Sequence, residues 1–257
     1  MRLILGLDRP TSGTATVNGR PYHELSAPLR EVGALLEARA IHTGRSAYHH
    51  LLAMAQTHGI GRQRVDEVIE LVGLTEVARK RAGGFSLGMG QRLGIASALL
   101  GDPEVLILDE PANGLDPEGV RWLRDLIHGL TDDGRTVLVS SHILAEIAHT
   151  VDSVVILDHG RLVTHAPLEQ LTGAAGWGVR VRTPSAEELR EVLSRAGIDA
   201  RITEPDRVEI VNATCEQIGT LAAKHQIPIF EITPHQVNLE DVFLELTGTK
   251  ASEQDSR

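Results

Sequence analysis

The feature that most constrains this chain is an alternation, between Arg30 and His165, of short apolar runs with longer segments of helical periodicity. Parallel strands joined by crossover helices produce this alternation, so it predicts an α/β domain. We expect strands at Glu31 to Leu36, Glu104 to Leu108, Thr136 to Ser140 and Ser153 to Leu157. The middle two runs are almost wholly apolar and rich in β-branched residues, which predicts central positions in a sheet that is covered on both faces.

Local signals place helices between these strands. Asp116 is expected to cap a helix that begins at Pro117, and Ser86 to cap an earlier one. The helix after Asp116 has an inward stripe of Val120, Leu123, Ile127 and Leu130. The helix after Ser86 has an inward stripe of Met89, Leu93, Ala96 and Leu100. Near the start, Thr14 to Val17 followed by Asn18-Gly19 predicts a strand that ends in a tight turn.

The small residues Gly173 to Gly176 mark a change of pattern and predict a domain boundary. We expect an α/β domain at 1–172, an α+β domain at 177–248 and a disordered tail at 249–257. The strands of the second domain are expected at Val179 to Arg182, Ala200 to Thr203, Val208 to Val211 and Pro228 to Ile232. Its helices would begin at capping boxes, Ser185 with Glu188 and Thr214 with Gln217. The order β-α-β-β-α-β is that of a ferredoxin-like unit, and from Asn238 onward a final short helix is expected.

Composition excludes several classes of protein. With 257 residues, 42% of them hydrophobic, the chain can bury a substantial core without disulfides or metals. A net charge of -10 argues against broad binding of nucleic acid, and 3% aromatic residues argue against stacking on bases.

Cellular location can also be predicted from composition. The one cysteine, Cys215, cannot form an internal disulfide, which favours a reducing compartment. No apolar run approaches the roughly 20 residues of a membrane-spanning helix, so we expect a cytoplasmic protein that reaches the membrane only through a partner. The twelve histidines show no zinc-binding spacing and are interpreted as surface or packing residues.

The strongest chemical signal is the apolar run from Val105 to Leu108 that ends in Asp109-Glu110. Ligands of open α/β sheets bind at the carboxyl ends of the strands. Two adjacent acids there can divide the work of phosphoryl transfer: one holds Mg²⁺, and the other orients or deprotonates the attacking water. Taken alone, an exposed strand end with solvated acids explains this pair equally well.

Three further segments change that balance. Phe85-Ser86-Leu87-Gly88-Met89-Gly90-Gln91-Arg92 is a turn that enters a helix, whose free N–H groups favour a phosphate. Asn113-Gly114-Leu115-Asp116-Pro117 and Ser140-Ser141-His142 follow downstream. A simple capped helix and a structural histidine are the alternative interpretations of the first and last segments.

In this order, the segments resemble the ATP-binding subunit of ABC transporters over residues 1 to about 170. Phe85 to Arg92 resembles the signature motif, with Leu87 in place of its first glycine, and Ile107 to Glu110 resembles the Walker B strand. Gly114 to Asp116 corresponds to the D-loop and His142 to the switch histidine. Glu37 occupies the position of the glutamine loop. That variant, together with the ending Leu239 to Gly248, resembles the exporters of drug and peptide-antibiotic resistance.

The resemblance implies a P-loop NTPase-like fold and an ATPase that uses ATP and Mg²⁺. Glu110 and His142 would be catalytic, and Asp109 would hold the metal. Contacts to the nucleotide would come from Ser86, Gly88 and Met89 in trans, from Asp116 and from Glu37. The implied partners are a membrane permease and a second nucleotide-binding subunit, in a homodimer or a heterodimer. The subunit would lie on the inner face of the membrane, and its transported substrate is not readable from these residues.

The Walker A motif, G-x-x-x-x-G-K-[ST], does not occur in the sequence. Met1 to Leu7 resembles the rest of the helix that follows this motif, so the chain is expected to begin just past the phosphate loop and the first strand. A start codon assigned too far downstream is the favoured explanation, ahead of a decayed gene and of a working subunit without its own loop. The chain as written is predicted to be inactive alone.

Two other functions stay open at this point. One is a non-hydrolysing subunit that only donates the signature face to a partner. The other is a soluble ABC ATPase of translation or DNA repair, although such proteins usually have two cassettes or a long coiled coil. A non-functional fragment is the remaining alternative.

Overall fold

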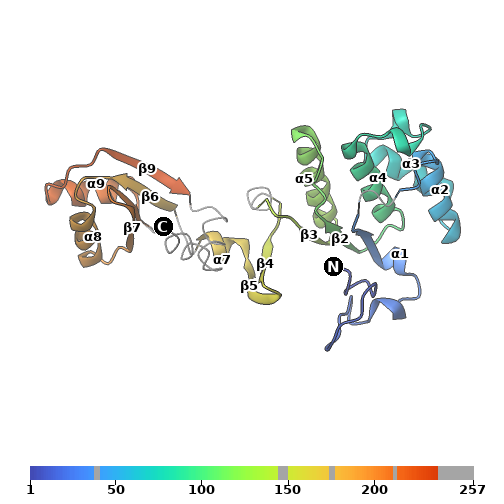
Figure 1. The fold of residues 1–257 in the computed structure, drawn as a ribbon, viewed down its shortest axis with the longest axis horizontal. Coiled ribbons are helices and arrows are strands. Elements are labelled where there is room, and N and C mark those ends of the chain that lie inside the picture. The colour runs from blue at the N-terminus through green and yellow to red at the C-terminus, as the bar shows by residue number, and fades with distance from the viewer. Residues whose placement is uncertain (38–40, 144–149, 174–176, 211–212, 237–257) are drawn as a thin grey trace, which may run out of the picture. The chain divides into compact units, whose positions relative to one another are not determined.

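The computed structural model describes the chain except for residues 38–40, 144–149, 174–176, 211–212 and 237–257 (Figure 1). Contacts between residues divide the chain into two compact units, unit 1 (Met1–Ile143) and unit 2 (Leu144–Arg257). Within the described ranges, no helix has the length and apolar character that crossing a membrane requires.

Unit 1 is built on a parallel sheet with the strand order β1-β2-β3. The strands are β1 (Val32–Leu35), β2 (Val105–Asp109) and β3 (Thr136–Ser140). The predicted central position is confirmed for β2, whose Leu106, Ile107 and Leu108 are buried. It is wrong for β3, which is the edge of this sheet and leaves Leu138 39% exposed. An apolar sequence does not by itself make a strand central, because its burial depends on which strands and helices pack against it.

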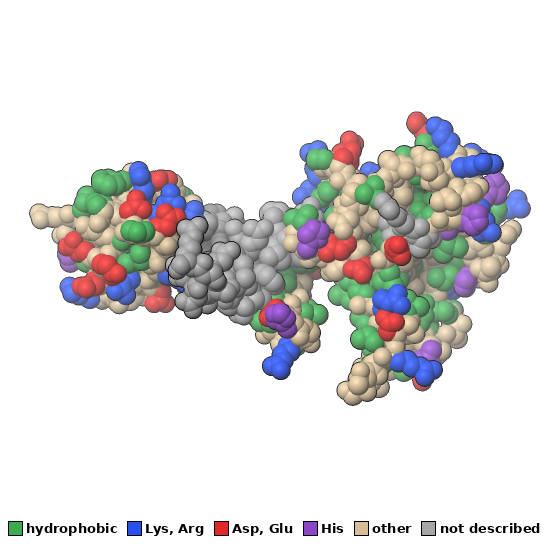
Figure 2. Space-filling view, in the orientation of Figure 1, with side chains coloured by type: hydrophobic (Ala, Val, Ile, Leu, Met, Phe, Trp, Pro, Cys, Tyr) green, Lys and Arg blue, Asp and Glu red, His purple; other side chains and the backbone are tan. Residues whose placement is uncertain are grey.

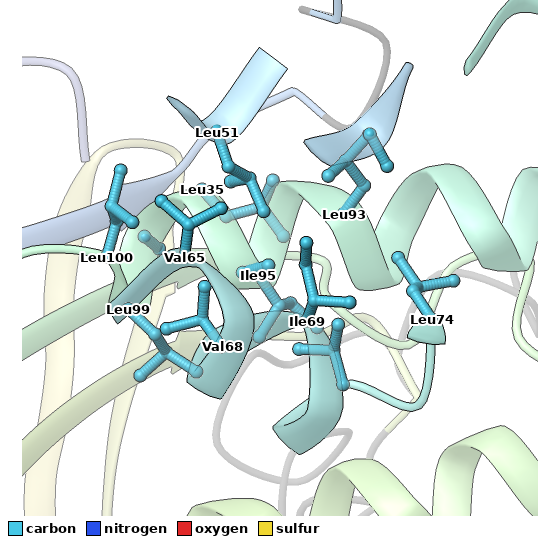
Figure 3. Close-up of a cluster of buried hydrophobic side chains, with 14 of the residues drawn as sticks. Leu35, Leu51, Val65, Val68, Ile69, Leu74, Leu93, Ile95, Leu99 and Leu100 are labelled. Carbon is cyan, nitrogen blue, oxygen red and sulfur yellow. The ribbon is translucent and has the colours of Figure 1, made fainter. Parts of the chain in front are cut away.

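The helices of unit 1 are α1 (Pro28–Glu31), α2 (Ala47–Thr57), α3 (Arg62–Leu71), α4 (Leu87–Leu99) and α5 (Pro117–Asp132), with 3-10 turns η1 (Tyr22–Glu24), η2 (Thr75–Val77) and η3 (Ala82–Gly84). The four longer helices, α2 to α5, pack around one apolar core, whereas α1 has no buried residue. Figure 3 shows side chains of α2, α3 and α4 meeting there, with Leu51, Val65 and Leu93 fully buried.

The helix caps follow the sequence. The Ser86 hydroxyl accepts a hydrogen bond from the Met89 N–H at 3.2 Å, and the Asp116 carboxylate accepts one from the Gly119 N–H at 2.8 Å. Pro117 is the first residue of α5, as predicted. These caps confirm both predicted helix starts, because a cap depends on atoms only three residues apart.

The first twenty residues differ from the prediction. Asn18 and Gly19 form the expected turn, with φ angles of 50° and 76°. The predicted strand before them is reduced to one bridge between Val17 and Arg20. Residues 1–7 form turns rather than the predicted end of a helix, since so short a segment pays the cost of helix nucleation without enough propagation.

Unit 2 begins with an antiparallel hairpin of β4 (Ser153–Asp158) and β5 (Arg161–Pro167), followed by α7 (Leu168–Gly173). The hairpin buries Val154 and Ile156 but leaves Val155, Leu157 and Leu162 at least half exposed. The contact division after Ile143 places this hairpin in unit 2, whereas the sequence places it in the first domain. The predicted limits 1–172, 177–248 and 249–257 stay predictions, and the predicted last helix lies outside the described residues.

The rest of unit 2 follows the predicted β-α-β-β-α-β order. The elements are β6 (Trp177–Arg182), α8 (Ala186–Arg195), β7 (Ala200–Glu204), β8 (Arg207–Ile210), α9 (Cys215–Lys224) and β9 (Glu231–Gln236). All strand pairs are antiparallel, in the order β7-β8-β6-β9, and the two central strands are the first and third of the unit. This topology confirms the ferredoxin-like prediction.

Two details of unit 2 differ from the prediction. Ser185 occupies the N-cap position of α8 without a side-chain cap hydrogen bond. Its N–H, which Glu188 would accept in a capping box, is accepted at 3.1 Å by the Thr183 hydroxyl, which donates to the Pro228 carbonyl at 2.7 Å. The last strand begins at Glu231 rather than Pro228. The second predicted capping box, Thr214 with Gln217, is confirmed.

Candidate nucleotide-processing site

The predicted acids lie where the parallel sheet of unit 1 ends. β2 is paired on both sides, and its last residue, Asp109, lies opposite Ser140 of β3. Glu110 follows directly, with a φ of 48° that is uncommon for a residue other than glycine. Because the strands are parallel, their carboxyl ends bring polar side chains to the same edge.

Ser140 connects the two acids. Its hydroxyl donates to Asp109 Oδ1 at 2.5 Å and accepts the backbone N–H of Glu110 at 2.9 Å. Sequence reasoning assigned no role to this serine. Its place at the end of the next predicted strand was the available signal, since parallel strand ends meet.

His142 reaches the second acid. Its Nδ1–H donates to Glu110 Oε2 at 2.8 Å, so the structure brings together the two residues predicted to be catalytic. About a third of the Glu110 side chain is exposed, and most of the His142 ring faces solvent. This carboxylate is therefore oriented by a histidine while it stays open to a water molecule, as a general base must be.

Gln91, also without a predicted role, supports this edge from α4. It is 3% exposed, and its Nε2 donates to the carbonyls of Glu110 at 3.2 Å and Pro111 at 2.9 Å. The amide thus holds the turn in which Glu110 adopts its left-handed conformation. A glutamine within an otherwise apolar, buried stretch of helix was the sequence signal for such a role.

The predicted signature segment packs against the turn after β2. A Cβ atom at Gly114 would lie 2.2 Å from the Leu87 side chain, and φ at Gly114 is 78°. One at Gly88 would lie 3.1 Å from the Gly114 carbonyl. Leu87, the departure from the family motif, therefore fits only because residue 114 has no side chain.

Among the described residues, the remaining predicted ligands form no hydrogen bond with the two acids. Ser86 and Asp116 serve as the helix caps described above, and Met89 supplies the N–H that Ser86 accepts. Glu37 is exposed, two residues beyond the end of β1. It lies at the same edge of the sheet as Asp109, but their roles toward a nucleotide stay predictions.

The carboxylates at this edge suit Mg²⁺ better than a metal ion that takes all its ligands from protein side chains. The described residues contain no group of three or more His, Cys, Asp and Glu side chains arranged to hold a metal ion. Mg²⁺ is usually bound by one or two carboxylates, with water and substrate phosphates completing its shell. Asp109 at the end of β2 fits that requirement.

Comparisons with known proteins relate this chain to the ATP-binding proteins of ABC transporters. The family model described as "ABC transporter" matches residues 1–113, and one described as "Domain of unknown function (DUF8746)" matches residues 177–240. The bacitracin transport ATP-binding protein BcrA of Bacillus licheniformis is 36% identical over 256 residues, which cover 96% of this chain and 83% of that protein.

Two further matches cover less of the chain. The lantibiotic transport ATP-binding protein SrtF of Streptococcus pyogenes is 36% identical over 163 residues, or 63% of this chain and 70% of its own. A solved structure described as the ATP-binding subunit of an ABC transporter superposes with a TM-score of 0.60 at 27% identity. It covers 67% of this chain and 74% of that one.

Proposed function

This chain belongs to the ATP-binding proteins of ABC transporters, and from that premise we propose that it drives export of peptide antibiotics through a separate membrane permease. It is an ATPase by family. The export of antibiotics is supported by the names of its relatives, which transport bacitracin and lantibiotics. The permease recognises the exported compound, and this subunit supplies the energy.

The observation that carries the proposal is the linked group of Asp109, Glu110, Ser140 and His142. ATP supplies the phosphoryl group whose transfer to water releases the free energy. Asp109 would hold Mg²⁺, which would neutralise charge on the phosphates, and Glu110 accepts the proton of the attacking water on its carboxylate. His142 orients Glu110 through Oε2 and presents its exposed ring edge toward the γ-phosphate.

The residues present complete only part of a nucleotide site. The metal carboxylate, the base and the signature segment are here, but the 257 residues include no G-x-x-x-x-G-K-[ST] loop to bind the phosphates. We expect a second nucleotide-binding subunit to face this one. In that dimer, Ser86 and Gly88 contact ATP held by the phosphate loop of the partner, and the pair associates with the inner face of the membrane through the permease.

The function is tested by deleting the gene in its host and measuring the inhibitory concentrations of bacitracin and a lantibiotic. We expect susceptibility to rise, and a wild-type copy to restore resistance. Glu110→Gln should fail to restore it, whereas Glu209→Gln, a matched change in unit 2, should succeed. Unchanged susceptibility to both antibiotics after deletion would refute the proposed export.

A second candidate is a subunit that donates only its signature face. It is supported by the well-formed start of α4, which the Ser86 side chain caps. Each lost charge-assisted hydrogen bond weakens binding by about 1.5 to 3 kcal/mol. Calorimetry on the purified 257-residue chain should therefore detect no tight MgATP binding under this candidate, and micromolar affinity would exclude it.

A further inference from the structure

A patch of positive charge lies on unit 1, away from the acids of the nucleotide site. We define the basic patch as Arg45, Arg79, Lys80 and Arg81, all of them exposed. It stands out in a chain whose net charge is -10. Figure 2 shows Lys, Arg and His side chains gathered over the end of unit 1 that carries α2 in Figure 1.

Backbone hydrogen bonds bring the two segments of the patch side by side. Tyr48 N–H donates to the Ala78 carbonyl at 2.9 Å, and Ala82 N–H donates to the Arg45 carbonyl at 2.9 Å. Ser46 and Arg81 form an isolated antiparallel bridge. The charges are therefore held together by main-chain atoms, and a change of side chain leaves this framework in place.

The patch has no internal counter-charge. Residues 41–50 and 78–85 contain no Asp or Glu. Within the described ranges, none of its four cationic side chains forms an ion pair, although arginines elsewhere do, such as Arg64 with Asp102 at 2.9 Å. Burial and then the positive charges of Arg45 and His42 lower the pKa of His50, which shows the same local excess of positive charge.

The composition of the patch favours a protein partner over a membrane. None of the large apolar side chains that the structure leaves exposed within the described residues lies in 41–50 or 78–85, so nothing there would insert between lipids. Three of the four cations are arginines, which bind carboxylates through two parallel hydrogen bonds. The Arg79 guanidinium lies 4.8 Å from the centre of the Tyr48 ring, and Arg and Tyr are enriched at protein interfaces.

We propose that the basic patch binds a carboxylate-rich segment of a partner protein, a run of Asp and Glu side chains. Such a segment supplies the counter-charge that unit 1 lacks at this place. Attraction between the two also speeds encounter and selects against basic partners. The interaction needs no nucleotide, so it stands or falls separately from the proposed ATPase.

The probe is a fluorescein-labelled glutamate peptide, followed by fluorescence polarisation at about 20 mM salt, where screening is weak. The chain as a whole repels this peptide, so binding requires a local cationic site. We expect saturable binding, weakened about tenfold or more by Arg45→Glu with Lys80→Glu. The matched control, Arg121→Glu with Arg161→Glu, changes the net charge equally outside the patch and should weaken binding less than about threefold.

Other results would overturn the proposal. These are no binding by the parent chain, equal weakening by both double variants, or binding to phosphatidylserine vesicles without binding to the peptide. The pair Arg45→Gln with Lys80→Gln guards against misfolding, because it removes charge without adding repulsion. It should weaken binding at an unchanged melting temperature, and unchanged affinity would also overturn the proposal.

Discussion

The parallel sheet of unit 1 and the four-stranded sheet of unit 2 place their polar groups in opposite ways. In β2 of unit 1, three consecutive residues are buried, and the acids proposed to act on ATP come only where the strand ends. In β8 of unit 2, exposed Arg207 and half-buried Glu209 alternate with buried Val208 and Ile210. The charges of unit 2 pair across strands, as Arg180 does with Glu209 at 2.8 Å.

The difference follows from what covers each sheet. A parallel strand between helical layers has no polar face, so its chemistry is concentrated at the carboxyl edge. An antiparallel sheet with helices on one face leaves the other to charged side chains that neutralise one another. Carboxylates of unit 1 are therefore candidates for catalysis, and those of unit 2 for stability.

The largest expected effect tests this contrast between carboxylates. Glu110→Gln in the transporter assembled with its permease should lower ATP turnover about 100-fold or more, because an amide cannot accept the proton of the attacking water. Nucleotide binding should be unchanged. The control, Glu209→Gln, loses an ion pair in unit 2 and should leave turnover within about twofold. Unchanged turnover in Glu110→Gln would refute the assignment of the base.

Core truncations compare the two units next. Leu106 of β2 and Leu189 of α8 are both 0% exposed. Replacing either by alanine should lower the free energy of unfolding by about 2–5 kcal/mol, from lost burial and the cavity left behind. Amide hydrogen exchange should report faster exchange in the unit that carries the change. If Leu189→Ala speeds amide exchange more in unit 1 than in unit 2, Leu189 does not belong to the core of unit 2.

Gln91 gives a smaller effect with a distinct signature. Gln91→Met keeps the side-chain volume but removes the donor to the Glu110 and Pro111 carbonyls, at a cost of about 1–3 kcal/mol in urea unfolding. Because the turn carrying Glu110 is then less well held, kcat should fall while KM for ATP is unchanged. Ser97→Ala is the control, since its hydroxyl bonds only within α4. If Gln91→Met and Ser97→Ala lower kcat equally, Gln91 has no positioning role.

The smallest expected effect is on stability at low pH. Acid should lower the free energy of unfolding of the two units in different pH ranges. The lowered pKa of His50 means that the unfolded chain takes up a proton first as the pH falls below about 6.5. Unit 1 is then fully stabilised above that pH and loses stability as the pH falls through the lower, folded value.

Glu216 marks the corresponding range in unit 2. A hydrogen bond to its own backbone and then one to Thr214 lower its pKa, so its contribution is lost only below about pH 4.3. Melting curves between neutral pH and about pH 3 should show the difference. His50→Gln should flatten the upper range, and a curve identical to that of the parent chain would contradict the assignment.

Much of the local structure could be predicted because its causes are local. The caps of Ser86, Asp116 and Thr214 depend on atoms three residues apart, and the order of elements in unit 2 follows from periodicity and turns. The capping box predicted at Ser185 does not form, and Thr183, anchored to the distant Pro228, accepts the Ser185 N–H in place of Glu188. Nothing within the local sequence signals that contact.

The site was predictable to the same extent. Adjacent acids at the end of an apolar strand indicated the edge where chemistry belongs, and His142 does reach Glu110. The partners that hold the acids, Ser140 and Gln91, lie 30 and 19 positions away from Glu110 along the chain. Their contacts depend on the register of β2 with β3 and on the packing of α4, which periodicity does not contain.

By itself, the sequence determined the kinds of element, their order, the helix caps and the two carboxylates, because each of these depends on near neighbours. Only the tertiary structure decided that β3 is an edge strand, that Leu87 packs on Gly114, and that Ser140 joins the two acids. It also decided that the two segments carrying the basic patch lie side by side. Such features arise from the spatial meeting of distant segments, and pairing, packing and charge act across that space regardless of separation along the chain.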